Sequence, residues 1–160
     1  MESAAANGRP FDTVLMLGVA AGSPYWRVER CGRNADESRT DVDGYTPPGG
    51  PIDPEGPEII DVSQPVDLLV QELKQSGLPA TATSSAGGFL CNHVLYRTLA
   101  LCRDLVPAPL CGFLHVPADE ATYAAGSPEG AVFPWTWEID ALQSVLEALS
   151  RAQRDGEPAE

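Results

Sequence analysis

A chain of 160 residues suits a single domain with a real core, and its hydrophobic content of 43% is ordinary for a globular protein. The formal net charge of -13 argues against nucleic acid and against anionic membrane surfaces, because binding to either depends on Lys and Arg. No apolar run approaches the roughly 20 residues that a membrane-spanning helix needs. Residues 1–10 have neither the basic region nor the apolar run of a signal peptide, so we expect a cytoplasmic protein that begins with a disordered stub.

The first part of the chain predicts two strands and a long loop. Residues 11–20 form an apolar run typical of a buried strand, and residues 25–31 alternate polar and apolar side chains. Residues 34–61 contain five prolines and eight acidic residues, so regular structure is not expected there. A loop of this length in a compact domain is usually functional or disordered.

A helix is predicted next. Ser63 is a suitable N-cap, Pro65 fits the first turn, and Gly77 is the natural C-terminal cap. The apolar positions recur at helical spacing, at Val66, Leu69, Val70 and Leu73.

The second half repeats the pattern of strand and helix. We expect a strand at 79–84, a helix at 88–103 and a strand at 110–116. A loop over 118–136 leads to a last helix at 136–154, whose apolar face comprises Ile139, Leu142, Val145, Leu146 and Leu149. We expect residues 155–160 to form a polar, flexible tail.

Strands that alternate with helices predict an α/β fold. We expect one domain over residues 11–154, with a mainly parallel central sheet covered by helices on both faces. The functional site of such a fold lies at the carboxyl ends of the strands.

The most informative stretch is Ser84–Asn92, which reads as a strand end, a glycine turn and the start of a helix that carries Cys91. A helix start concentrates free N–H groups and positive potential, which favours the nucleophilic thiolate. His115 follows near the end of another predicted strand. A cysteine and a histidine at neighbouring strand ends are the residues that a cysteine hydrolase needs.

The other cysteines give no sign of a metal site. Cys102 and Cys111 lie among leucines and are expected to be buried, and neither they nor Cys31 form a CxxC or zinc-type cluster. We expect no metal and no cofactor.

Two blocks, Ser85–Asn92 with Tyr96 and Gly112–Pro117, closely resemble the pyroglutamyl peptidase I (pyrrolidone-carboxylate peptidase) family, cysteine peptidases that remove N-terminal pyroglutamate. Further resemblance lies in Gly18–Gly22, in Val28–Arg30 and at Asn34, and the likeness extends from about residue 11 to 151.

The resemblance implies a Cys-His-Glu triad of Cys91, His115 and Glu29. His115 would accept the thiol proton, Glu29 would orient the imidazole, and the backbone N–H of Cys91 would help to hold the oxyanion. Arg39 stands ten residues after Glu29, where the family places an arginine near the oxyanion. The family does not fix a histidine at His93, which we expect to be structural or exposed.

The chain departs from the family at its start. Family members open with a strand, a phenylalanine- and glycine-rich loop that walls the pyroglutamyl ring, and a helix, and these have no counterpart here. We therefore expect an N-terminally shortened member whose sheet has an exposed edge, whose acyl pocket is more open and which forms a homo-oligomer. Four aromatic residues could either rebuild the pocket or pack the edge, and we expect packing: Tyr25, Trp26, Trp135 and Trp137.

These observations predict a cysteine hydrolase that cleaves an amide, either an N-terminal pyroglutamyl group or a related acyl group, in a small-molecule or peptide substrate. The same triad could instead serve a different reaction, such as amidase, acyl-transfer or lactam-forming chemistry. A non-catalytic binding subunit is the third alternative. The reactivity of the thiol separates it from the first two.

Overall fold

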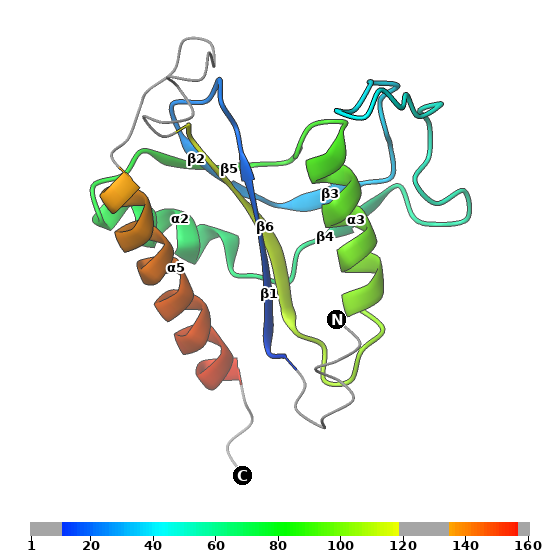
Figure 1. Cartoon of the computed structure of the whole chain (residues 1–160). Coiled ribbons are helices and arrows are strands. Elements are labelled where there is room, and N and C mark those ends of the chain that lie inside the picture. The colour runs from blue at the N-terminus through cyan, green and yellow to red at the C-terminus, as the bar shows by residue number, and fades with distance from the viewer. Residues whose placement is uncertain (1–10, 119–134, 157–160) are drawn as a thin grey trace.

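The computed structural model describes residues 11–118 and 135–156 (Figure 1). The expected stub at 1–10, the loop segment 119–134 and the tail residues 157–160 lie outside the described residues, as do the side chains of Trp135 and Trp137.

A four-stranded sheet forms the centre of the fold. It consists of β1 (Thr13–Val19), β2 (Trp26–Glu29), β5 (Ala80–Thr83) and β6 (Leu110–Val116), in the order β1-β6-β2-β5. The pairs β1–β6 and β2–β5 are parallel, whereas β2 and β6 are antiparallel. The predicted α/β class with a mainly parallel sheet is confirmed. The antiparallel step in its middle was not expected from the sequence.

A second, two-stranded sheet corrects the predicted loop at 34–61. The strand expected at 25–31 breaks at Arg30, after which β3 (Cys31–Arg33) pairs antiparallel with β4 (Ile59–Asp61). The N–H of Arg30 still donates to Thr83 O of the main sheet, and its carbonyl accepts from Val62 N. The chain thus changes sheets at Arg30, and the last residues of the proline-rich segment are a strand because β3 supplies a partner.

Helices cover both faces of the main sheet (Figure 1). Helices α2 (Val66–Gln75) and α5 (Trp135–Gly156) lie on one face, and α3 (Leu90–Cys102) lies on the other. Helix α5 begins one residue before and ends two residues after the predicted bounds. Among the helices of the described residues, none has the length and apolarity to span a bilayer.

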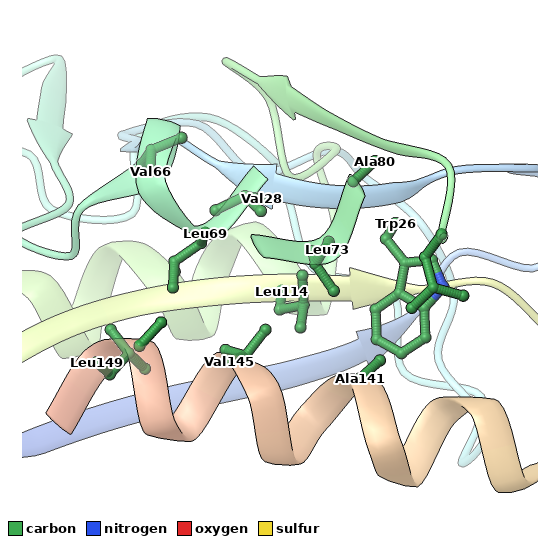
Figure 2. Close-up of a cluster of buried hydrophobic side chains, with 12 residues drawn as sticks. Trp26, Val28, Val66, Leu69, Leu73, Ala80, Leu114, Ala141, Val145 and Leu149 are labelled. Atoms are coloured by element: carbon green, nitrogen blue, oxygen red, sulfur yellow. The ribbon is translucent and has the colours of Figure 1, made fainter. Parts of the chain in front are cut away.

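The larger core lies between the sheet and the helix pair α2–α5 (Figure 2). Trp26 is fully buried in this core, so its ring packs the interior, whereas Tyr25 is about half exposed. The smaller core lies under α3 and contains Leu95, Leu99 and Phe113. The sheet face under α3 is the one that carries the candidate site.

The predicted N-cap of α2 is wrong. Pro65 occupies the cap position, and no side chain caps the helix. The Ser63 hydroxyl donates instead to Pro109 O and accepts from Cys111 N, so it ties the start of β6 to the segment before α2. The predicted C-terminal glycine is confirmed, because Gly77 follows the cap residue with φ of +82°.

Candidate active site

The turn before α3 has a backbone shape that needs glycine. Gly87 has φ of +86°, in the left-handed region, and its N–H donates to Ser85 Oγ. A Cβ at Gly88 would lie 2.5 Å from the Glu37 side chain, and the Glu37 N–H donates to Gly88 O at 2.6 Å. The turn is therefore held tightly against the loop that begins at residue 34.

Cys91 is the second residue of α3 and is partly buried. Its Sγ lies above β1, where a Cβ built on Gly18 would approach it to 3.1 Å. The side chain also packs against the cluster that contains Phe113. Because Gly18 pairs with His115 in the β1–β6 register, the thiol sits beside the strand position of the histidine.

The environment of Cys91 does not favour the thiolate as the sequence led us to expect. Burial raises the pKa of the Cys91 thiol, and the negative charge of Glu29 raises it further. The Arg27 cation and the backbone N–H at the helix start act in the opposite direction but do not prevail. The thiol therefore needs a neighbouring base to become a nucleophile at neutral pH.

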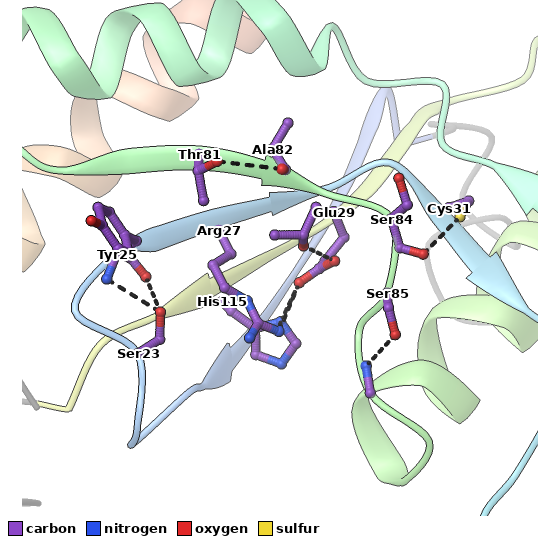
Figure 3. A network of polar contacts seen from close by, with 12 residues as sticks. Ser23, Tyr25, Arg27, Glu29, Cys31, Thr81, Ala82, Ser84, Ser85 and His115 are labelled. Carbon is purple, nitrogen blue, oxygen red and sulfur yellow. Dashed lines mark hydrogen bonds and ion pairs between the residues drawn. The ribbon is translucent and has the colours of Figure 1, made fainter. Parts of the chain in front are cut away.

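His115 and Glu29 form a buried pair on the same sheet face (Figure 3). His115 Nδ1 lies 2.7 Å from Glu29 Oε1, and the exposed fractions of the two side chains are 5% and 0%. A carboxylate only accepts hydrogen bonds, so the contact assigns the proton to Nδ1 and leaves Nε2 as the basic nitrogen. The Phe113 ring lies against the imidazole, with 4.7 Å between ring centroids.

Two further residues hold Glu29, and sequence reasoning missed both. Thr83, at the end of β5, donates its hydroxyl to Glu29 Oε2. The Arg27 Nη2 atom lies 3.2 Å from Glu29 Oε1 and 3.5 Å from His115 Nδ1. The only available signal was strand alternation, which puts Arg27 and Glu29 on one face of β2.

The two residues after Cys91, Asn92 and His93, attach α3 to the end of β3 and to the loop that follows it. Asn92 is fully buried, and its amide accepts from Arg33 N and donates to Arg33 O and Ala35 O at 2.8–2.9 Å. His93 is partly exposed, and its Nδ1 lies 2.5 Å from Asp36 Oδ2. His93 thus anchors the loop after β3 to α3, in agreement with the expected structural or exposed role.

Arg39 lies near the turn before α3 but outside the buried pair of His115 and Glu29. Its guanidinium carbon is 5.0 Å from the centre of the Phe89 ring, and Phe89 is the N-cap residue of α3. The side chain is exposed. A cation over an aromatic face is held by the ring quadrupole, which keeps this positive charge close to the start of the helix.

The structure therefore brings Cys91, His115 and Glu29 to one face of the sheet, with Arg39 at its rim. All four cysteines are free thiols, and Cys102 and Cys111 are buried as predicted. Within residues 11–118 and 135–156, no three His, Cys, Asp or Glu side chains converge as ligands for a metal ion.

Comparisons with known proteins agree on one family. The model of the pyroglutamyl peptidase family matches residues 2–151. The pyrrolidone-carboxylate peptidase of Levilactobacillus brevis is 31% identical over 147 residues, which is 90% of this chain and 71% of the relative. That of Oceanobacillus iheyensis is 37% identical over 105 residues, and that of Streptomyces coelicolor is 40% identical over 107. The chain spans about half the length of these last two relatives, at 53% and 50%.

Solved structures show the same fold. The pyroglutamyl peptidase I from Bacillus amyloliquefaciens superposes with a TM-score of 0.83 at 25% identity, over 95% of this chain and 71% of that one. A mutant pyrrolidone carboxyl peptidase from Pyrococcus furiosus gives a TM-score of 0.82 at 23% identity, over 94% and 73% of the two chains. Since the family model covers nearly the whole sequence and the fold agrees throughout, this chain belongs to the pyroglutamyl peptidase family.

Proposed function

We propose that this protein is a cysteine hydrolase that cleaves the amide bond of an N-terminal pyroglutamyl or related acyl group, with Cys91, His115 and Glu29 as its triad. The observation that carries the proposal is the buried contact of 2.7 Å between His115 and Glu29, on the sheet face that Cys91 covers. The relatives named pyrrolidone-carboxylate peptidase support the substrate class.

The first chemical step is proton transfer from Cys91 to His115 Nε2. Glu29 accepts from Nδ1 and stabilises the imidazolium that forms, as the carboxylate of a catalytic triad does. The thiolate attacks the acyl carbonyl, and the imidazolium then protonates the leaving amine. Water hydrolyses the resulting thioester, with His115 as base, and restores the thiol.

Charge on the carbonyl oxygen needs donors during this step. The backbone N–H of Cys91 at the start of α3 is one, and the positive end of the helix dipole supports it. Arg39, stacked on Phe89 next to that helix start, adds a nearby cation for the oxyanion or the substrate.

The test is release of aminocoumarin from pyroglutamyl-aminocoumarin by the full chain. We expect turnover by the wild type, none by Cys91→Ala, and little change in Cys102→Ala, a matched cysteine replacement at the other end of α3. Circular dichroism of both variants checks that each folds.

The rate at which iodoacetamide alkylates Cys91 near neutral pH distinguishes the alternative functions if the pyroglutamyl substrate is not turned over. No turnover with rapid alkylation would indicate a different substrate or an acyl-transfer reaction. No turnover with the sluggish reaction of an ordinary thiol would favour a binding subunit.

We also propose that the protein forms a homo-oligomer and that it resides in a reducing compartment such as the cytoplasm. Strand β1 is an edge of the described main sheet and leaves Leu17 and Val19 about half exposed, and on α5 Ile139 and Leu146 are similarly exposed. Apolar surface of this kind marks contact sites. Four free cysteines are consistent with a reducing environment.

Size-exclusion chromatography with light scattering measures the molar mass of the protein in solution and so its oligomeric state. We expect an oligomer that Leu146→Glu dissociates. Val94→Glu serves as the matched control, because Val94 is equally apolar and exposed but lies on α3. A monomeric wild type would contradict the association.

A further inference from the structure

Arg27 places a positive charge in the middle of a sheet face that is covered by a helix, where apolar or neutral side chains are usual. The antiparallel register places it directly opposite His115, and Glu29 follows two residues later on the same face. Its side chain is only 27% exposed, and its Nε atom is buried without a hydrogen-bond partner among the described residues. Holding a guanidinium there lowers stability unless a nearby charge compensates it.

The compensating charge is Glu29, which Arg27 shares with the imidazole. Both Arg27 Nη2 and His115 Nδ1 approach the same oxygen, Glu29 Oε1, at 3.2 and 2.7 Å. Thr83 occupies the other oxygen, Oε2. The carboxylate is therefore fixed at both oxygens, and its charge is partly neutralised before the reaction begins.

The same guanidinium also acts on the nucleophile. The charged groups that act on the Cys91 thiol are Glu29 and Arg27 from β2. The titratable His115 of β6 pairs in register with Gly18 beside the thiol, and Glu37 and Arg39 lie against Gly88 and Phe89 in the turn before α3. Glu29 raises the pKa of the Cys91 thiol, and Arg27 lowers it. Without Arg27 the carboxylate that orients His115 would also oppose the thiolate with its full charge.

We propose that Arg27 is a positioning residue of this site: its guanidinium holds the Glu29 carboxylate in place and offsets its charge, so that the Cys91 thiolate can form beside it. The role of Arg27 in catalysis rests on the proposed function. Its effect on the ionisation of the Cys91 thiol does not, and that effect can be measured without any substrate.

The experiment is the pH dependence of Cys91 alkylation by iodoacetamide in the full chain, with Cys91→Ala as the blank. Arg27→Met keeps an unbranched apolar stem at this position but removes the guanidinium and its charge. We expect its alkylation midpoint to rise by roughly one pH unit, as loss of a neighbouring opposite charge does. Arg27→Lys keeps the charge and is expected to retain a midpoint close to that of the wild type.

Arg30→Met is the matched control. Arg30 belongs to the same stretch of chain, but it is exposed and pairs with Asp67 on α2. Its midpoint should equal that of the wild type. A residue that only stabilised the fold would lower the melting temperature in both Arg27 variants and leave both midpoints in place.

An unchanged midpoint in Arg27→Met, or an equal shift in Arg27→Lys, overturns the inference. If Arg27→Met does not fold, Arg27→Gln replaces it with the same expectation. Failure of the proposed function has a different signature. In that case the wild type would not turn over the pyroglutamyl substrate, while the midpoint of Arg27→Met would still rise.

Discussion

Replacement of Gly18 by alanine tests whether β1 sets the position of the Cys91 thiol, the proposed nucleophile. A methyl group on Gly18 would lie 2.8 Å from Phe113 Cζ, 3.0 Å from Phe113 Cε1 and 3.1 Å from Cys91 Sγ. Non-bonded atoms of this size prefer about 3.5–4.0 Å, so the ring and the thiol must each retreat by roughly 0.5–1 Å. The Phe113 ring also lies against His115, so its retreat moves that imidazole, the proposed base, as well.

The expected effect is larger on activity than on stability. Overpacking of this kind destabilises a fold by about 1–3 kcal/mol. A misplacement of about 1 Å between reacting groups can lower the rate on the order of 100-fold. We therefore expect Gly18→Ala to remain folded while kcat/KM for pyroglutamyl-aminocoumarin falls by roughly 10- to 100-fold.

Two assays and one matched variant make this prediction decisive. Gly22→Ala adds the same methyl group in the turn just after β1, where a Cβ would have no atom within 4 Å, and it should behave as the wild type. Turnover reports the whole site, and alkylation by iodoacetamide reports Cys91 alone. Wild-type values of both in a folded Gly18→Ala protein would refute the idea that Gly18 makes room for the thiol.

Three further predictions follow from individual contacts. Glu29→Gln keeps the shape of the side chain but removes its charge, so kcat should fall on the order of 10³- to 10⁴-fold, as in other triads, with the melting temperature as the control for folding. Asn92→Ala removes the partner of the Arg33 N–H and of the Ala35 carbonyl, whereas the Arg33 carbonyl still accepts from Ala35 N, and urea unfolding should show a loss of about 2 kcal/mol or more. Burial and the neighbouring Cys102 raise the pKa of Cys111 from 9.0 to about 12, so the folded state keeps a proton that the unfolded state loses above pH 9. Stability should therefore fall as the pH rises from 9 towards 12 through this group, and Cys111→Val should show a smaller dependence of the unfolding free energy on pH in that range.

Patterns that depend on near neighbours in the chain were predictable. The apolar spacing from Val66 to Leu73, and Gly77 after it, gave α2 and its end, since a helix satisfies its backbone locally. The turn before Cys91 was likewise predictable, because the left-handed backbone at position 87 favours glycine. The motifs around Cys91 and His115 gave the family that the comparisons established.

Features that depend on distant partners were not predictable from the sequence. Ser63 has the composition of an N-cap, but its hydroxyl is used by Pro109 and Cys111, far along the chain. The strand at 59–61 exists because β3 lies beside it, and nothing in its own three residues requires that. The predicted direction of the shift in the Cys91 pKa was wrong for the same reason. The helix start is visible in the sequence, whereas burial and the charge of Glu29 appear only in the folded chain.

The arrangement around Glu29 is difficult to explain by stability alone. A fully buried carboxylate has lost its hydration, and contact with a guanidinium and an imidazole repays this only in part. Among the described residues the buried Nε of Arg27 has no hydrogen-bond partner, and an unpaired buried donor lowers stability further. An apolar side chain at either position would pack this sheet face without such losses. The network is accounted for if Glu29 must carry charge beside His115, if His115 must take a proton from a thiol whose pKa burial has raised, and if Arg27 limits the effect of that charge on the thiol.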